Sequence, residues 1–147
     1  MIYLGADHRG YNLKEEIKRF LGQEKIKFKD LGNLKYDQND DYPDFAQKVA
    51  AMVSSQPKDK GLLICGSGIG MSIAANKFKG VRAALCLSGY MAKEAKRAID
   101  ANILCLAADL TDIATAKSII REWLKASFKK EPRYIRRVKK INQLPNY

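Results

Sequence analysis

Short apolar runs alternate along the chain with longer stretches in which apolar residues recur at every third or fourth position. The short runs are typical of buried β-strands, and the longer spacing is typical of amphipathic helices. Strands are expected at residues 2–4, 61–65, 81–86 and 102–107, with one more that begins at 26–28. Five strands separated by helices predict an α/β fold, with an open parallel sheet covered on both faces.

The apolar spacing predicts a helix after each strand and one more at the C-terminal end. Leu13 and Ile17 mark the inner face of the first helix, and Pro43 suits the first turn of the second. The polar stretch 31–42 before Pro43 is long enough to wall a site. The helices are expected near residues 13–21, 43–53, 71–78, 90–99, 113–124 and 132–141.

Length and composition narrow the class of protein. The 147 residues, 46% of them hydrophobic, suit one compact domain over 1–147. No apolar window approaches the roughly 18 residues of a membrane span, and the first residues lack the basic and apolar regions of a signal peptide. The three cysteines form no C-x-x-C pair, so neither a disulfide framework nor a zinc cluster is indicated. We therefore expect a cytoplasmic protein with no membrane partner.

Positive charge is concentrated near the C-terminal end. The formal net charge is +11, and residues 117–140 hold ten Lys or Arg against two Glu. Such a segment can bind nucleic acid, or it can supply a few arginines to a phosphate group. Arg133 and Arg137 are four residues apart and share a helix face, which suits a phosphate, whereas Arg136 lies about 100° away. No reading helix or aromatic stacking motif is evident, so nucleic acid is not the expected partner.

Two loops that follow the first and third strands can carry chemistry. They are residues 7–10, Asp-His-Arg-Gly, and residues 65–70, Cys-Gly-Ser-Gly-Ile-Gly, and both open toward the same edge of a parallel sheet. The second loop places the thiol of Cys65 before three glycines and a helix N-terminus, a setting that favours a thiolate. A thiolate can act as nucleophile or base, and Ser67 can relay a proton or donate to an oxyanion. The same residues also fit a small buried cysteine followed by a tight turn.

Signatures of common cofactors are missing from the sequence. The third glycine of the second loop comes one position too early for a dinucleotide fingerprint, and no glycine precedes the Lys-Ser or Lys-Thr of a Walker loop. His8 is the only histidine and stands beside Asp7, so it is either structural or part of the ligand-binding edge. No metal-binding motif accompanies it, and no metal is expected. Structural or solvated roles are assigned to Cys86, Cys105, Asp37, Asp40 and Asp41.

Several motifs of the chain occur together in one family of enzymes. They are Gly5-Ala-Asp-His-Arg-Gly10, Asp41-Tyr-Pro43, Ile64-Cys-Gly-Ser-Gly-Ile-Gly70, Ser72-Ile-Ala-Ala-Asn-Lys77 and Arg133-x-x-x-Arg137. Over nearly its full length the chain resembles the ribose-5-phosphate isomerase B and galactose-6-phosphate isomerase family. The resemblance implies a Rossmann-like three-layer α/β/α sandwich with a five-stranded parallel sheet and an extra C-terminal helix. It also implies a phosphorylated sugar as substrate, no cofactor, and a homodimer or tetramer whose active sites are shared between chains.

The resemblance further implies a role for each loop residue at the reacting end of the substrate. In the family an aldose phosphate and its ketose, here ribose 5-phosphate and ribulose 5-phosphate, interconvert through a cis-enediolate. One base moves the proton between C1 and C2, and Cys65 matches that base. The Ser67 hydroxyl and nearby backbone groups would hold the enediolate oxygens. Those backbone groups belong to Gly66, Gly68, Ile69 and Gly70.

The other end of the substrate is assigned by the same resemblance. Asp7 and His8 would contact the sugar and phosphate end of the molecule. Arg133 and Arg137 would clamp the phosphate group.

The chain departs from the family at neighbouring positions. Relatives that act on ribose phosphate usually carry His-Asn, with the histidine as the acid that opens the sugar ring, where this chain has Ala98 and Ile99. An arginine that many relatives use as a ligand contact aligns with Asp109. We interpret the chain as an enzyme that acts on the open-chain sugar or opens the ring with another group. The alternatives are a subunit of a galactose-6-phosphate-type isomerase that needs a paralogous chain, and a non-catalytic sugar-phosphate-binding protein.

Overall fold

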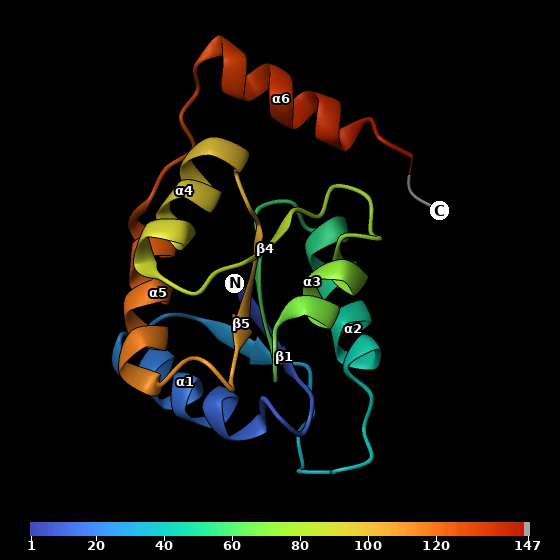
Figure 1. The fold of residues 1–147 in the computed structure, drawn as a ribbon, viewed down its shortest axis with the longest axis vertical. Coiled ribbons are helices and arrows are strands. Elements are labelled where there is room, and N and C mark those ends of the chain that lie inside the picture. Colours follow the sequence, from blue (N-terminus) through green and yellow to red (C-terminus); the bar gives the residue numbers. More distant parts are fainter. Residues whose placement is uncertain (146–147) are drawn as a thin grey trace.

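A computed structural model describes residues 1–145, which contain a five-stranded sheet in which every strand pairing is parallel. The strands are β1 (Ile2–Ala6), β2 (Phe28–Asp30), β3 (Lys60–Cys65), β4 (Ala83–Leu85) and β5 (Ile103–Ala107). Their order across the sheet is β2-β1-β3-β5-β4, so β2 and β4 are the edges (Figure 1). The predicted α/β class and the five-stranded parallel sheet are confirmed.

Helices cover both faces of this sheet. They are α1 (Tyr11–Gln23), α2 (Tyr42–Ser55), α3 (Ile69–Ala75), α4 (Gly89–Ile99), α5 (Ile113–Lys125) and α6 (Pro132–Asn142). α1, α4 and α5 pack on one face, and α2 and α3 pack on the other (Figure 1). The expected three layers and the extra C-terminal helix are therefore present. Among residues 1–145, none of the helices is both long and apolar enough to span a membrane.

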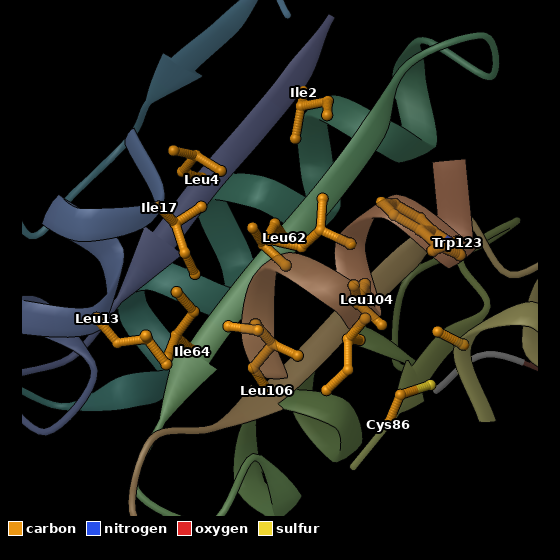
Figure 2. Packing of buried hydrophobic residues seen from close by; sticks show 14 of the residues in the cluster. Ile2, Leu4, Leu13, Ile17, Leu62, Ile64, Cys86, Leu104, Leu106 and Trp123 are labelled. Carbon is orange, nitrogen blue, oxygen red and sulfur yellow. The ribbon is translucent and has the colours of Figure 1, made fainter. Parts of the chain in front are cut away.

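Side chains alternate between the two faces of each strand and divide the core into two parts. Leu62 and Ile64 of β3 pack on the side of α1, α4 and α5, where Trp123 is buried (Figure 2). Leu63 and Cys65 point to the opposite side and pack against α2 and α3. A strand buried on both faces has a nearly continuous apolar sequence, which explains why the short runs predicted the strands.

Several elements differ by a few residues from their predicted bounds, among them β2 and α3 at their starts. The second strand begins at Phe28 rather than Ile26, because Phe28 pairs with Ile2, the first residue of β1. Helix α3 begins at Ile69 rather than Met71. Gly68 adopts a left-handed conformation with φ of 72°, which lets the chain turn from β3 directly into the helix.

Helix α6 lies at the amino edge of the sheet and packs lightly on the rest of the chain (Figure 1). None of its residues is buried, and Ile135 is 47% exposed. Near its C-terminal end, Asn142 Oδ1 accepts a hydrogen bond from Nη1 of Arg82 at 3.1 Å, and Arg82 immediately precedes β4. A cavity of about 410 Å³ lies between this end of the helix and the amino ends of β4 and β5.

Gly10 provides a test of the packing between the β1–α1 loop and β3. A Cβ added at Gly10 would lie 2.4 Å from the carbonyl oxygen of Ile64, whereas one added at Gly22 would meet nothing within 4 Å. We expect Gly10→Ala to lower the free energy of unfolding by about 1–3 kcal/mol through overpacking. Gly22→Ala should raise it by up to about 1 kcal/mol, because alanine favours a helix. Denaturant titration measures both, and equal effects of the two substitutions would contradict this packing.

Candidate active site

Backbone hydrogen bonds join the carboxyl ends of β1, β3 and β5. The N–H of Asp7 donates to the carbonyl of Ile64 at 3.3 Å, and the N–H of Asp109 donates to that of Gly66 at 3.0 Å. The strand order reverses between β1 and β3, and open α/β sheets bind ligands at such a point. The two loops singled out in the sequence therefore open side by side at one edge of the sheet.

The loop after β3 is built around the sulfur of Cys65. This residue is 4% exposed, and its Sγ accepts a hydrogen bond from the N–H of Gly68 at 3.1 Å. The sulfur thus lies at the carboxyl end of β3 with a backbone N–H directed at it. Ser67 and Ile69 are exposed on the rim, where the N–H of Ile69 donates to Ser67 Oγ at 3.3 Å. A side chain at position 68 is excluded, since its Cβ would lie 2.5 Å from Leu85.

Two side chains from other elements cover the glycines of this loop. A Cβ added to Gly70 would lie 2.5 Å from Cζ of Tyr42, at the start of α2. A Cβ added to Gly66 would lie 2.2 Å from Cζ of Arg9, in the β1–α1 loop. Sequence analysis gave neither Tyr42 nor Arg9 a role. Arg9 lies in the motif of residues 5–10, and Tyr42 lies in the motif of residues 41–43. Their place in these motifs is the one sequence signal that could have assigned them to the site.

The other two cysteines are packing residues, as the sequence predicted. Cys86 and Cys105 are 1% and 0% exposed. Burial raises the pKa of the Cys86 thiol to about 11 and raises the pKa of the Cys105 thiol as well. Both side chains are therefore neutral thiols in the core at neutral pH.

Asp7 shapes the loop after β1. It is 5% exposed, and its Oδ1 accepts hydrogen bonds from the N–H groups of Arg9 and Gly10, both at 3.0 Å. Burial raises the pKa of this carboxyl, while the two N–H donors and the neighbouring His8 act in the opposite direction. Since one oxygen serves the turn, Oδ2 is the atom available to a ligand.

His8 is held by a carboxylate that the sequence did not assign to the site. Its Nδ1 lies 2.8 Å from Oδ1 of Asp40, which also accepts the His8 backbone N–H at 2.9 Å. Asp40 Oδ2 accepts from Nδ2 of Asn33 at 2.6 Å. The prediction that Asp40 is solvated was therefore wrong, because its side chain is only 9% exposed. Asp37 and Asp41 are exposed, as predicted.

A buried lysine fixes the segment that carries Asn33 and Asp40. The Nζ of Lys14 in α1 is fully buried and donates to the carbonyl of Asn33 at 2.8 Å and to Oδ2 of Asp30 at 2.5 Å. A buried charge requires such partners. Sequence analysis missed Lys14, although it lies three positions before Ile17 and so shares the inner face of the helix.

The ligating atoms of Asp7, His8 and Asp40 lie within 4.8 Å of one another, a spacing that a metal ion could bridge. The hydrogen bond that Asp40 accepts from Nδ1 of His8 raises the pKa of the imidazole, and the charges of Asp7 and Asp40 act in the same direction. A protonated imidazole cannot ligate a metal, so a shift toward the protonated form disfavours metal binding by these three side chains.

The expected phosphate clamp does not reach the cysteine of the same chain. Arg133 and Arg137 are exposed on α6 at the amino edge of the sheet, while Cys65 ends β3 at the carboxyl edge. A five-residue strand spans about 16 Å, which places the two edges beyond the reach of an arginine.

Ala98 and Ile99 lie on the last turn of α4 and line a cavity of about 400 Å³ beside β4.

The pair of His8 and Asp40 predicts a raised imidazole pKa, which can be measured directly because the chain has one histidine. We expect its NMR titration midpoint to lie above the ordinary value of about 6.5, and Asp40→Asn to lower it. Since the folded-state pKa exceeds the unfolded one, the pair stabilises the fold below about pH 6.5 and loses this contribution as pH rises through the folded-state pKa. Asp37→Asn, on the same loop, should leave the midpoint unchanged. An equal midpoint in Asp40→Asn and the unmodified chain would contradict the pairing.

Comparison with known proteins identifies the family. The chain matches the Ribose/Galactose Isomerase family over residues 2–141. It is 43% identical over 141 residues to the probable ribose-5-phosphate isomerase B of Mycoplasma genitalium, over 95% of this chain and 92% of that protein. The structure of ribose-5-phosphate isomerase B from Clostridium thermocellum has a TM-score of 0.92 and 45% identity, covering 97% of this chain and 95% of that one.

A second solved structure is similar to the same extent and contains a ligand. It is ribose-5-phosphate isomerase B from Mycoplasma genitalium with bound ribulose-5-phosphate, with a TM-score of 0.93 and 41% identity, covering 97% of this chain and 93% of that one. The match over residues 2–141 and these similarities over nearly all of the chain show that it belongs to the ribose/galactose isomerase family of sugar-phosphate isomerases.

Proposed function

We propose that this protein interconverts ribose 5-phosphate and ribulose 5-phosphate through a cis-enediolate, with Cys65 as the base. The observation that carries the proposal is the placement of the Cys65 sulfur in a glycine-rich loop at the carboxyl edge, where Gly68 donates a hydrogen bond to it. Similarity to ribose-5-phosphate isomerases B supports the choice of substrate. Residues 1–147 would serve as one isomerase domain in the reducing cytoplasm, in keeping with three free cysteines.

The reaction moves protons and needs no oxidant. The Cys65 thiolate takes the proton from C2 of the open-chain aldose, the C–H electrons form the C1–C2 double bond, and the carbonyl oxygen becomes an enediolate oxygen. The proton then returns to C1, and the C2 hydroxyl proton passes to the oxygen on C1. Exposed Ser67 relays that proton, and the N–H groups of the loop stabilise the enediolate charge.

His8 takes part at the sugar end. Ala98 supplies no acid for ring opening, so the enzyme acts on the open-chain sugar or uses another donor. Asp40 engages Nδ1 of His8 and leaves Nε2 for a sugar oxygen. The buried Asp7 offers Oδ2 beside it.

We place Arg133 and Arg137 in the active site of a second copy of the chain. Cys65 lies at the carboxyl edge of the sheet, and the two arginines lie at the amino edge. Each edge therefore carries half of a site (a half-site), and two copies of the chain are needed to bring the halves together. The edge strand β4 is flanked by apolar side chains that a monomer leaves in water, among them Ile73 at 58% and Tyr90 at 74% exposed. Apolar exposure of this kind marks an interface between chains.

A paralogous partner chain is the alternative occupant of that interface. The observation that favours it is the position of Ala98 and Ile99, which line an apolar cavity beside β4. In that case the partner would supply the ring-opening acid, and the substrate would be a galactose-6-phosphate-type sugar.

The isomerase proposal is tested by NMR of ribose 5-phosphate in D2O. The unmodified protein should form ketose that carries deuterium at C1 and, through the reverse reaction, aldose that carries deuterium at C2. Cys65→Ala should abolish conversion and exchange, since it removes the base. Cys86→Ala, which removes a buried cysteine without a role in the reaction, should retain both. Full activity in Cys65→Ala would exclude this base, and no conversion by the unmodified protein would exclude this substrate for the chain on its own.

A further inference from the structure

The Arg9 side chain lies over the loop of residues 65–70, which begins with Cys65. Its guanidinium lies over Gly66, the residue after Cys65, so closely that an added Cβ would be 2.2 Å from Cζ, 2.4 Å from Nε and 2.6 Å from Nη1. Its Nη2 donates a charged hydrogen bond to Oδ2 of Asp109, in the loop after β5. The group is thus fixed against the loop from two sides.

Backbone contacts hold both members of this pair at the site. The N–H of Arg9 donates to Oδ1 of Asp7 at 3.0 Å, and the N–H of Asp109 donates to the carbonyl of Gly66 at 3.0 Å. The pair therefore connects the ends of β1, β3 and β5 at the place where the substrate would bind.

The stability of the fold does not explain this arrangement. The side chains of Arg9 and Asp109 are 54% and 47% exposed, and an ion pair in water contributes little to folding. A guanidinium has five N–H donors. Asp109 is bonded to Nη2, and the described residues give Nε and Nη1 no hydrogen-bond acceptor.

The charges around the site favour an anion only when Arg9 is present. Asp7, Asp40 and Asp109 bring carboxylates to the loops of this edge, where Asp40 is paired with His8 and Asp109 with Arg9. Arg133 and Arg137 of the same chain lie at the opposite edge. Without Arg9, the carboxylates of this half-site would repel a phosphate group.

We propose that Arg9 is a substrate-binding residue that contacts the phosphate group, and that Asp109 is a positioning residue that holds the Arg9 guanidinium over Gly66. The inference rests on the proposed function and adds the phosphate contact that this half-site contributes. It also gives a role to Asp109, one of the positions at which the sequence departs from the family pattern.

The test measures binding and turnover separately. Arg9→Ala should raise the KM and the Kd for ribose 5-phosphate, and the Ki of inorganic phosphate, by about tenfold or more, because a charge-assisted contact is lost. The kcat should change little, since the contact exists before and during the reaction. Arg9→Lys should restore part of the affinity, because lysine keeps the charge but not the planar donors. Arg19→Ala removes an exposed positive charge from α1 and should change none of these quantities.

Asp109→Asn shows whether Asp109 positions the Arg9 guanidinium or only repels the phosphate group. In the presence of Arg9 it should weaken phosphate binding, because the guanidinium loses its anchor. In an Arg9→Ala background it should strengthen binding, because a carboxylate facing the phosphate is removed. Stronger binding in both backgrounds would overturn the positioning role.

Other outcomes overturn the role of Arg9 or the proposed function, and they can be told apart. An isomerase whose KM, Kd and Ki are unaffected by Arg9→Ala, or whose kcat alone falls, would overturn the phosphate contact and leave the isomerase assignment intact. A protein that neither binds nor converts ribose 5-phosphate would overturn the proposed function itself.

Discussion

The site depends on the hydrogen bonds that join three parallel strands at their carboxyl ends. The N–H of Asp7 bonds to β3, and the N–H of Asp109 bonds to the carbonyl of Gly66, so the loops after β1, β3 and β5 form one surface. The left-handed Gly68 then directs its N–H at the sulfur of Cys65. A substitution that separates these loops would move Cys65, the N–H groups around its sulfur and the side chains of Asp7 and Asp109 together.

A chain of polar contacts extends from the core to this surface. Buried Lys14 bonds to the backbone of Asn33, Asn33 bonds to Asp40, and Asp40 holds His8. Each member of this chain bonds to the next and fixes it in place, although Oδ1 of Asn33 is buried without a hydrogen-bond partner among residues 1–145. The long loop between β2 and α2 is therefore part of the site.

The sequence predicted the layers well because both core parts are built from periodic apolar positions. Leu62 and Leu63 point to opposite faces, yet both belong to one apolar run. The two glycine-containing loops were also found, since turn residues at strand ends are local signals. The partners of His8 and Arg9 were not found, because Asp40 lies 32 residues away and Asp109 lies 100 residues away. Pairing between charged residues leaves no periodic pattern, and it becomes visible only when the topology brings the loops together.

If Cys65 and Arg137 act on one substrate, as proposed, a complete active site must combine two molecules, because these residues lie at opposite edges of one sheet. Mixing Cys65→Ala with Arg137→Ala under conditions that exchange subunits tests this most directly. Each variant alone should be nearly inactive at low substrate concentration. A mixed dimer contains one site in which both residues are intact, so random exchange should restore about one quarter of the unmodified activity. A mixture that stays inactive after exchange has been demonstrated would show that each chain builds its site alone.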